Sequence, residues 1–92
     1  MTLNEQEIIN AICSHMAERK SVQPTQVNVQ LEWDENLGFS AEVTIDGRSQ
    51  YIVEANMLEA IERYMLSHYD RRVFRSDLEL DVEDEMFCRI KD

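Results

Sequence analysis

Apolar and polar side chains alternate along most of residues 27–45, and this pattern restricts the fold of the 92-residue chain more than any other feature. A period of two places successive side chains on opposite faces of a strand. The pattern therefore predicts two strands, 27–34 and 39–45, each buried on one face. A five-residue turn, 34–38, joins them and sets Trp33 opposite Phe39. The apolar positions are Val27, Val29, Leu31, Trp33, Phe39, Ala41, Val43 and Ile45.

A third strand is predicted beyond the turn signal Asp46–Gly47, around residues 50–54. A two-residue turn would pair Val43 with Gln50 and mix apolar with polar positions. We therefore expect a three-residue loop, with Gly47 in a left-handed conformation. Tyr51 and Val53 then join the apolar face, and Ile52 lies on the polar face.

Two amphipathic helices flank this meander. Asn4 followed by Glu7 has the spacing of a capping box and predicts a helix that runs to about Lys20. Asn56 followed by Glu59 repeats the pattern and predicts a second helix that reaches about Tyr69.

The last part of the chain alternates again. Leu78, Leu80 and Val82 predict a fourth strand, and residues 86–90 keep the same parity. These last residues either extend the strand or fold back as a fifth. Because no glycine lies between the two segments, we favour a continuation.

This element order predicts an α+β fold: a two-layer sandwich in the order α-β-β-β-α-β, with a mainly antiparallel sheet and both helices on one face. The length suits a single domain covering residues 1–92. The other sheet face would be left to solvent or to a partner.

Composition excludes several classes of function. The formal net charge of −10 argues against a nucleic-acid binder, which needs a positive surface. No apolar run exceeds three residues, so neither a signal peptide nor a membrane helix is expected. Cys13 and Cys88 lack the local spacing of a zinc or redox motif, which favours free thiols in a cytoplasmic protein without a cofactor.

An acidic surface is the leading candidate for function. Alternation places carboxylates, together with an exposed Ile52, on the face that the helices leave uncovered. Such a face favours solubility and protects the sheet against aggregation. It is also suited to docking a basic protein partner or cations. The predicted members are Glu32, Glu42, Ile52, Glu79, Asp81 and Glu83.

A basic segment, Arg71, Arg72, Phe74 and Arg75, follows the second helix. Its arginines are suited to offsetting the partial negative charge at the helix end. A second hypothesis is that this segment meets the acidic face of another copy, with Phe74 as a buried anchor, and so forms a homodimer.

No pattern points to catalysis. His68 lies on the predicted apolar side of the second helix, where a structural role is favoured over a catalytic one. The stretch Asp34–Gly38 superficially resembles a calcium loop, but its glycine is one place early and Ile45 occupies the position of the bidentate acid. We therefore expect a small interaction or accessory protein. A divalent-cation binder is the alternative, and a small enzyme is the third hypothesis.

The chain also resembles the YxcD-like family of small, uncharacterised Bacillus-type proteins. The resemblance is carried by Trp33–Asp34, by Gly38–Glu42, by Glu54–Ile61 and by Arg72–Phe74, together with the first helix. It implies a bacterial cytosolic domain and transfers no ligand, activity or catalytic residue.

Overall fold

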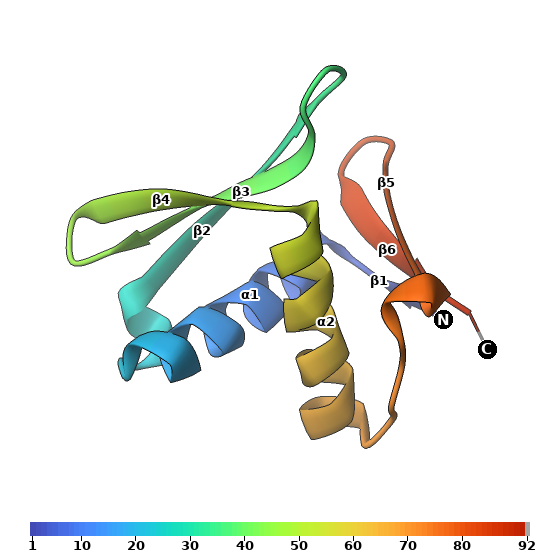
Figure 1. The fold of residues 1–92 in the computed structure, drawn as a ribbon, viewed down its shortest axis with the longest axis horizontal. Helices are drawn as coiled ribbons and strands as arrows, with labels where there is room; N and C mark the ends of the chain where they lie inside the picture. Colours follow the sequence, from blue (N-terminus) through green and yellow to red (C-terminus); the bar gives the residue numbers. More distant parts are fainter. Residues whose placement is uncertain (92) are drawn as a thin grey trace.

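The computed structural model describes residues 1–91, in which two helices and two antiparallel three-strand sheets form an α+β fold (Figure 1). The elements are β1 (Thr2–Leu3), α1 (Glu5–Lys20), β2 (Val27–Asp34), β3 (Gly38–Ile45), β4 (Arg48–Val53), α2 (Glu54–Tyr69), β5 (Leu78–Val82) and β6 (Met86–Ile90). Single 3-10 turns cover Pro24–Gln26 and Arg75–Asp77. The predicted fold class is confirmed, while the arrangement of the strands differs from the prediction.

The first hairpin has the predicted register, but its turn has three residues, 35–37, and not five, because Asp34 and Gly38 pair within the strands. Trp33 lies opposite Phe39, and Val29 lies opposite Val43. The Asp34 carboxylate closes the turn, because its Oδ1 accepts hydrogen bonds from the backbone N–H groups of Asn36 (2.7 Å) and Leu37 (3.1 Å). Gly38 then adopts a φ of 77°, which a side chain would disfavour.

The second hairpin corrects the prediction. Ile45 pairs with Arg48, so Asp46 and Gly47 alone form the turn, with φ values of 52° and 76°. Two left-handed residues give the tight turn whose twist matches that of the strands it joins. The resulting register turns Ile52 inward and Tyr51 outward. The three-residue loop was wrong because the apolar run Tyr51–Val53 does not itself show which residues face the core.

The C-terminal strands form a second sheet in the order β1-β6-β5. Residues 86–90 fold back on residues 78–82, so the favoured continuation was wrong, as was the placement of residues 78–82 in the same sheet as β2–β4. Val82 pairs with Met86 across residues 83–85, and none of these three turn residues has a positive φ. Leu3 of β1 pairs with Cys88 on the other side of β6.

The capping prediction holds for α1 and needs correction for α2. Asn4 Oδ1 accepts the Glu7 N–H at 2.9 Å, and Glu7 Oε1 accepts the Asn4 N–H at 3.2 Å. Helix α2 begins at Glu54, two residues before Asn56. Asn56 instead reaches back, and its Oδ1 accepts the Val53 N–H at 3.2 Å. Both helices end where predicted, at Lys20 and Tyr69.

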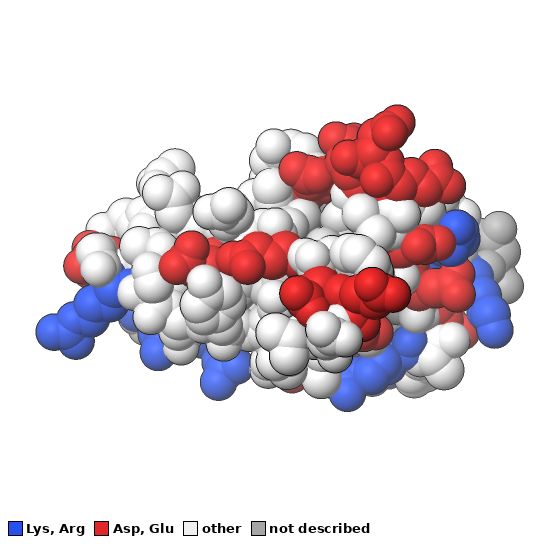
Figure 2. Space-filling model, turned by 90° about the horizontal axis from the view of Figure 1, so that it is seen from above, with Lys and Arg blue, Asp and Glu red and all other residues white. Residues whose placement is uncertain are grey.

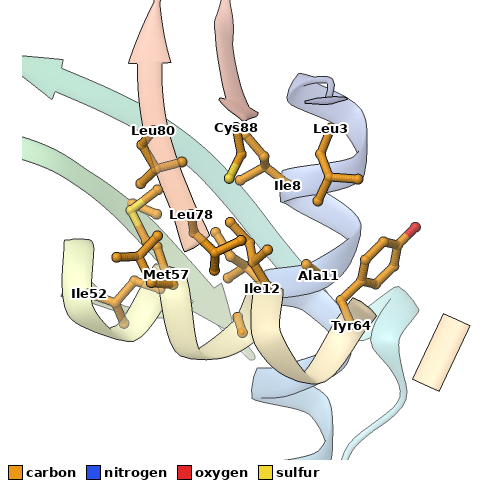
Figure 3. Close-up of a cluster of buried hydrophobic side chains, with 14 of the residues drawn as sticks. Leu3, Ile8, Ala11, Ile12, Ile52, Met57, Tyr64, Leu78, Leu80 and Cys88 are labelled. Carbon is orange, nitrogen blue, oxygen red and sulfur yellow. The ribbon is translucent and has the colours of Figure 1, made fainter. Parts of the chain in front are cut away.

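One hydrophobic cluster joins both helices and both sheets. Helix α1 packs against β2, α2 packs against β3 and β4, and both lie on the same side of that sheet (Figure 1). Figure 3 shows side chains of the second sheet directed toward those of the helices. The meeting residues include Ile8, Ile12, Met57, Leu78, Leu80 and Cys88. The outer face of the β2–β3–β4 sheet therefore has no helix over it.

Within residues 1–91, no helix has both the length and the apolar character needed to cross a bilayer.

Candidate interaction surface

The outer face of the β2–β3–β4 sheet combines carboxylates with exposed apolar groups. Register places Glu42 beside Tyr51, and Ser40 between Glu32 and Val53. Tyr51 is 62% exposed and Val53 is 59% exposed. We call the surface formed by Glu32, Glu42, Tyr51 and Val53 the acidic face. It is open to solvent and lies on the side away from the helices.

The charge of the acidic face is not offset locally. Glu32 and Glu42 make no ion pair with any residue in the range 1–91. These two carboxylates, Glu32 first, raise the pKa of the Tyr51 phenol above its ordinary value, which places all three groups in one electrostatic neighbourhood. The outward-facing strand residues include neither Lys nor Arg: Asn28, Gln30, Glu32, Asp34, Ser40, Glu42, Thr44, Ser49, Tyr51 and Val53.

Charge is unevenly distributed over the molecule as a whole. Figure 2 shows acidic side chains gathered near the centre and toward one end of the visible face, while basic side chains lie along one border and at both ends. This separation gives a basic partner an electrostatic preference for one part of the surface.

The second sheet holds the other predicted carboxylates in a different environment. Arg89 on β6 lies between two residues of β5, with its Nη1 2.6 Å from Glu79 Oε1 and its Nη2 2.9 Å from Asp81 Oδ2. A hydrogen bond from the Val82 N–H and, next, the bond from Arg89 lower the pKa of Asp81. Glu83 belongs to the exposed β5–β6 turn. The predicted single acidic platform is therefore divided between two sheets, and part of it is internally paired.

Ile52 does not belong to this surface. It is only 8% exposed and lies opposite Ala41 on the core side of the sheet. The change from a three-residue to a two-residue turn shifts the register by one position, which exchanges the two faces of β4. Tyr51 and Val53 are thus the exposed residues that sequence reasoning missed. The Asp46–Gly47 dipeptide was the signal that could have identified them.

The basic segment forms a mixed surface. Phe74 is 61% exposed, and Arg72 and Arg75 are exposed beside it. Arg71 is less exposed, and its Nη2 donates to the Lys91 carbonyl oxygen at 2.6 Å. Val73 lies in the core and anchors the segment. The structure therefore turns Arg72, Phe74 and Arg75 outward while Arg71 bonds to the chain's own backbone.

His15 is the most unusual titratable group. Its side chain is buried between the helices, and Nε2 has no hydrogen-bond partner within residues 1–91, although Glu59 Oε1 lies 3.6 Å away. Burial lowers the pKa of His15, and the nearby Glu59 carboxylate partly opposes that effect. His15 is therefore neutral in its folded environment at physiological pH.

The remaining candidates show no catalytic grouping. His68 is exposed, because residues 66–70 extend past the core, and its ring stacks on Tyr64 with centroids 4.3 Å apart. The predicted position of His68 on a buried face is thus wrong. Leu66 is likewise exposed. In residues 1–91 no three His, Cys, Asp or Glu side chains come together in a way that could hold a metal ion.

These features define a small acidic α+β protein with an uncovered carboxylate-bearing sheet face. Residues 1–85 match the family described as "Protein of unknown function (DUF2653)". The chain belongs to this family.

One curated relative matches most of the chain. It is the "Uncharacterized protein YxcD" of Bacillus subtilis (strain 168), 27% identical over 71 residues, which cover 76% of this chain and 70% of the relative. The resemblance inferred from the sequence is confirmed. No solved structure significantly matches the chain.

Proposed function

We propose that this protein is a small interaction module that binds a basic protein segment through the acidic face. One observation carries the proposal: an uncovered sheet face presents, beside exposed Tyr51 and Val53, two carboxylates that make no ion pair within residues 1–91. A solvated face needs its charges but gains nothing from two large apolar side chains at its edge. The combination is suited to a partner that brings both positive charge and apolar surface.

The position of the exposed apolar residues favours an extended partner. Tyr51 and Val53 lie on β4, which is an outer strand of its sheet. An outer strand has backbone N–H and C=O groups directed away from its neighbour, and a peptide in extended conformation can pair with them. A Lys or Arg side chain on the outward face of such a peptide would lie beside Tyr51 and reach toward Glu42, which is on β3 about 10 Å from the added strand. Glu32 on β2 is one strand further away and would add long-range attraction.

We also propose that the module acts in the cytoplasm. Cys13 and Cys88 are free thiols, and Cys88 is fully buried. Burial raises the pKa of the Cys88 thiol to about 11 and also raises the pKa of Cys13. Both cysteines are thus protonated and unreactive, as expected of thiols with a packing role in a reducing compartment.

The test uses a synthetic peptide of alternating Lys and Val, with a peptide of alternating Glu and Val as its counterpart. Calorimetry at low salt should detect binding of the Lys peptide only. The double variant Glu32→Gln/Glu42→Gln should weaken binding by about tenfold, since the charge-assisted contact with Glu42 is worth about 1.5 kcal/mol. Loss of the more distant Glu32 charge should lower the attraction further.

A matched control variant distinguishes the effect of the two acidic-face carboxylates on peptide binding from the effect of net charge. The variant Glu18→Gln/Glu85→Gln removes the same net charge at two exposed positions elsewhere, and it should keep binding within about twofold. Equal weakening in both double variants would mean that only net charge matters, and the proposed site would be abandoned. No binding of the Lys peptide would have the same consequence.

Self-association is a second candidate, favoured by the exposure of Phe74 between Arg72 and Arg75. The segment carries the kind of apolar and basic groups that the acidic face of another copy would accept. In a two-fold dimer each copy would supply both surfaces, so the contact would form twice.

A further inference from the structure

A groove of about 600 Å³ lies between the C-terminal end of α1 and the β3–β4 hairpin. It forms because the hairpin extends past Lys20, where α1 ends, and leaves the core side of its strands only partly covered. In Figure 1 this end of α1 and the β3–β4 turn lie at the same end of the molecule. The lining residues are Lys20, Val22, Val43, Ile45, Asp46, Arg48, Ser49 and Gln50.

The floor of the groove is apolar. Val43 and Ile45 face the core side of β3, and Val22 packs against the same cluster from the segment after α1. Val22 and Ile45 are only partly buried. A groove of this size, with apolar groups at its floor and polar side chains around them, is in the range that accommodates small molecules.

The rim of the groove is basic, which is unusual in a chain of net charge −10. Lys20 and Arg48 are exposed and make no ion pair within residues 1–91. Asp46 in the β3–β4 turn also lines the groove, so its three charged side chains sum to +1. Figure 2 shows basic side chains at the end opposite the main acidic gathering.

We infer that this groove binds a small aliphatic carboxylate. The carboxylate would accept hydrogen bonds from Lys20 and Arg48, and the hydrocarbon chain would lie on the partly exposed Val22 and Ile45, above the buried Val43. Arginine in particular is suited to a carboxylate because its planar group matches it with two parallel hydrogen bonds. A carboxylate without an alkyl chain would contact only the basic rim, and an uncharged alkyl chain would contact only the apolar floor. The inference is independent of the acidic face.

Octanoate is the probe for the test, with octanamide as its uncharged counterpart. An ¹⁵N NMR titration should show saturable shifts at residues 43–50 and around Val22 with octanoate, and much weaker binding of octanamide. Affinity should rise about fourfold for each methylene added between butanoate and octanoate, the gain expected for one buried CH₂ group.

Charge variants make the assignment specific. Lys20→Gln/Arg48→Gln should weaken octanoate binding by about tenfold or more, while Asp46→Asn should strengthen it by removing a repelling carboxylate. The matched control Arg63→Gln/Lys91→Gln removes the same charge at two exposed positions outside the groove and should change affinity by less than about twofold. Val22→Ser removes part of the exposed floor and should also weaken binding.

Three results would overturn the inference: no saturable shifts with millimolar octanoate, equal weakening by both arginine-containing double variants, or shifts centred away from the groove. The double variant Glu32→Gln/Glu42→Gln tests whether the two proposed sites are independent. It should leave octanoate binding unchanged, because both residues lie on the acidic face and not in the groove. A lack of octanoate binding in the groove can thus be distinguished from a lack of peptide binding at the acidic face. Circular dichroism of each variant confirms that it is folded before it is titrated.

Discussion

At the residue scale, His15 makes stability depend on pH. Its folded-state pKa is lowered by burial, so the unfolded chain binds a proton more readily than the folded one. Stability is therefore fully present above the unfolded pKa of about 6.5 and falls as pH decreases from there toward the folded pKa. The Glu59 carboxylate reduces this loss because it favours the protonated ring.

Urea unfolding at a series of pH values from neutral to mildly acidic measures this dependence. His15→Leu should remove much of the decrease in unfolding free energy between neutral pH and the folded pKa. Glu59→Gln should make the decrease steeper by lowering the pKa of His15 further. An unchanged pH profile in His15→Leu would show that other groups govern the acid sensitivity.

Tyr51 reports on the charge of the acidic face. Its phenol pKa is raised by Glu32 and Glu42, in that order. Replacing both with Gln should bring the Tyr51 pKa back toward the ordinary value of about 10, as followed by NMR of its ring signals. Tyr69, whose hydroxyl donates to Glu7 Oε2 at 2.7 Å, is the internal control and should titrate as before. An unmoved Tyr51 would mean that the three side chains do not share this face.

At the scale of elements, the β3–β4 turn determines which residues of β4 are exposed. Gly47 has a φ of 76°, so Gly47→Ala should lower the free energy of unfolding by about 1 kcal/mol or more through backbone strain. Asp46→Asn is the control, because Asn also accepts the left-handed conformation, and its cost should be under about 0.5 kcal/mol. Thermal unfolding measures both. Equal stability of the wild type and Gly47→Ala would argue against the two-residue turn.

Elements with a clear period were predictable from sequence, and ambiguous ones were not. The β2–β3 alternation sets Trp33 against Phe39, as observed. In β4 three consecutive apolar residues allow either face to be buried, so the choice depends on turn geometry. For β5 and β6, a straight strand and a hairpin with a three-residue loop give the same parity to Leu80 and Cys88, and therefore periodicity cannot distinguish them.

The candidate site was predictable in part for the same reason. Glu32 and Glu42 follow directly from the alternation of β2 and β3. The β4 register removes Ile52 from the predicted exposed surface and adds Tyr51 and Val53 to it. The pairing of Glu79 and Asp81 with Arg89 required knowledge of the β5–β6 hairpin. The groove between Lys20 and Arg48 joins residues far apart in sequence and has no local signal.

At the scale of the whole molecule, uneven charge makes self-association sensitive to salt. If the segment around Phe74 meets the acidic face of another copy, light scattering at high protein concentration and low salt should report a dimer. Added salt should dissociate it, because the charges involved are exposed and therefore screened. Phe74→Ser should also give a monomer. A monomer under all conditions would contradict self-association while leaving the binding of other basic partners in place.

The central claim is that the uncovered outer face of β2–β3–β4 recognises a basic extended segment. The most direct measurement is an ¹⁵N NMR titration of the wild-type protein with the alternating Lys–Val peptide. We predict shifts concentrated at residues 49–53 and at Glu42, with the amides of α1 unmoved. Shifts centred on β5 and β6, or scattered in proportion to negative charge over the whole surface, would contradict it.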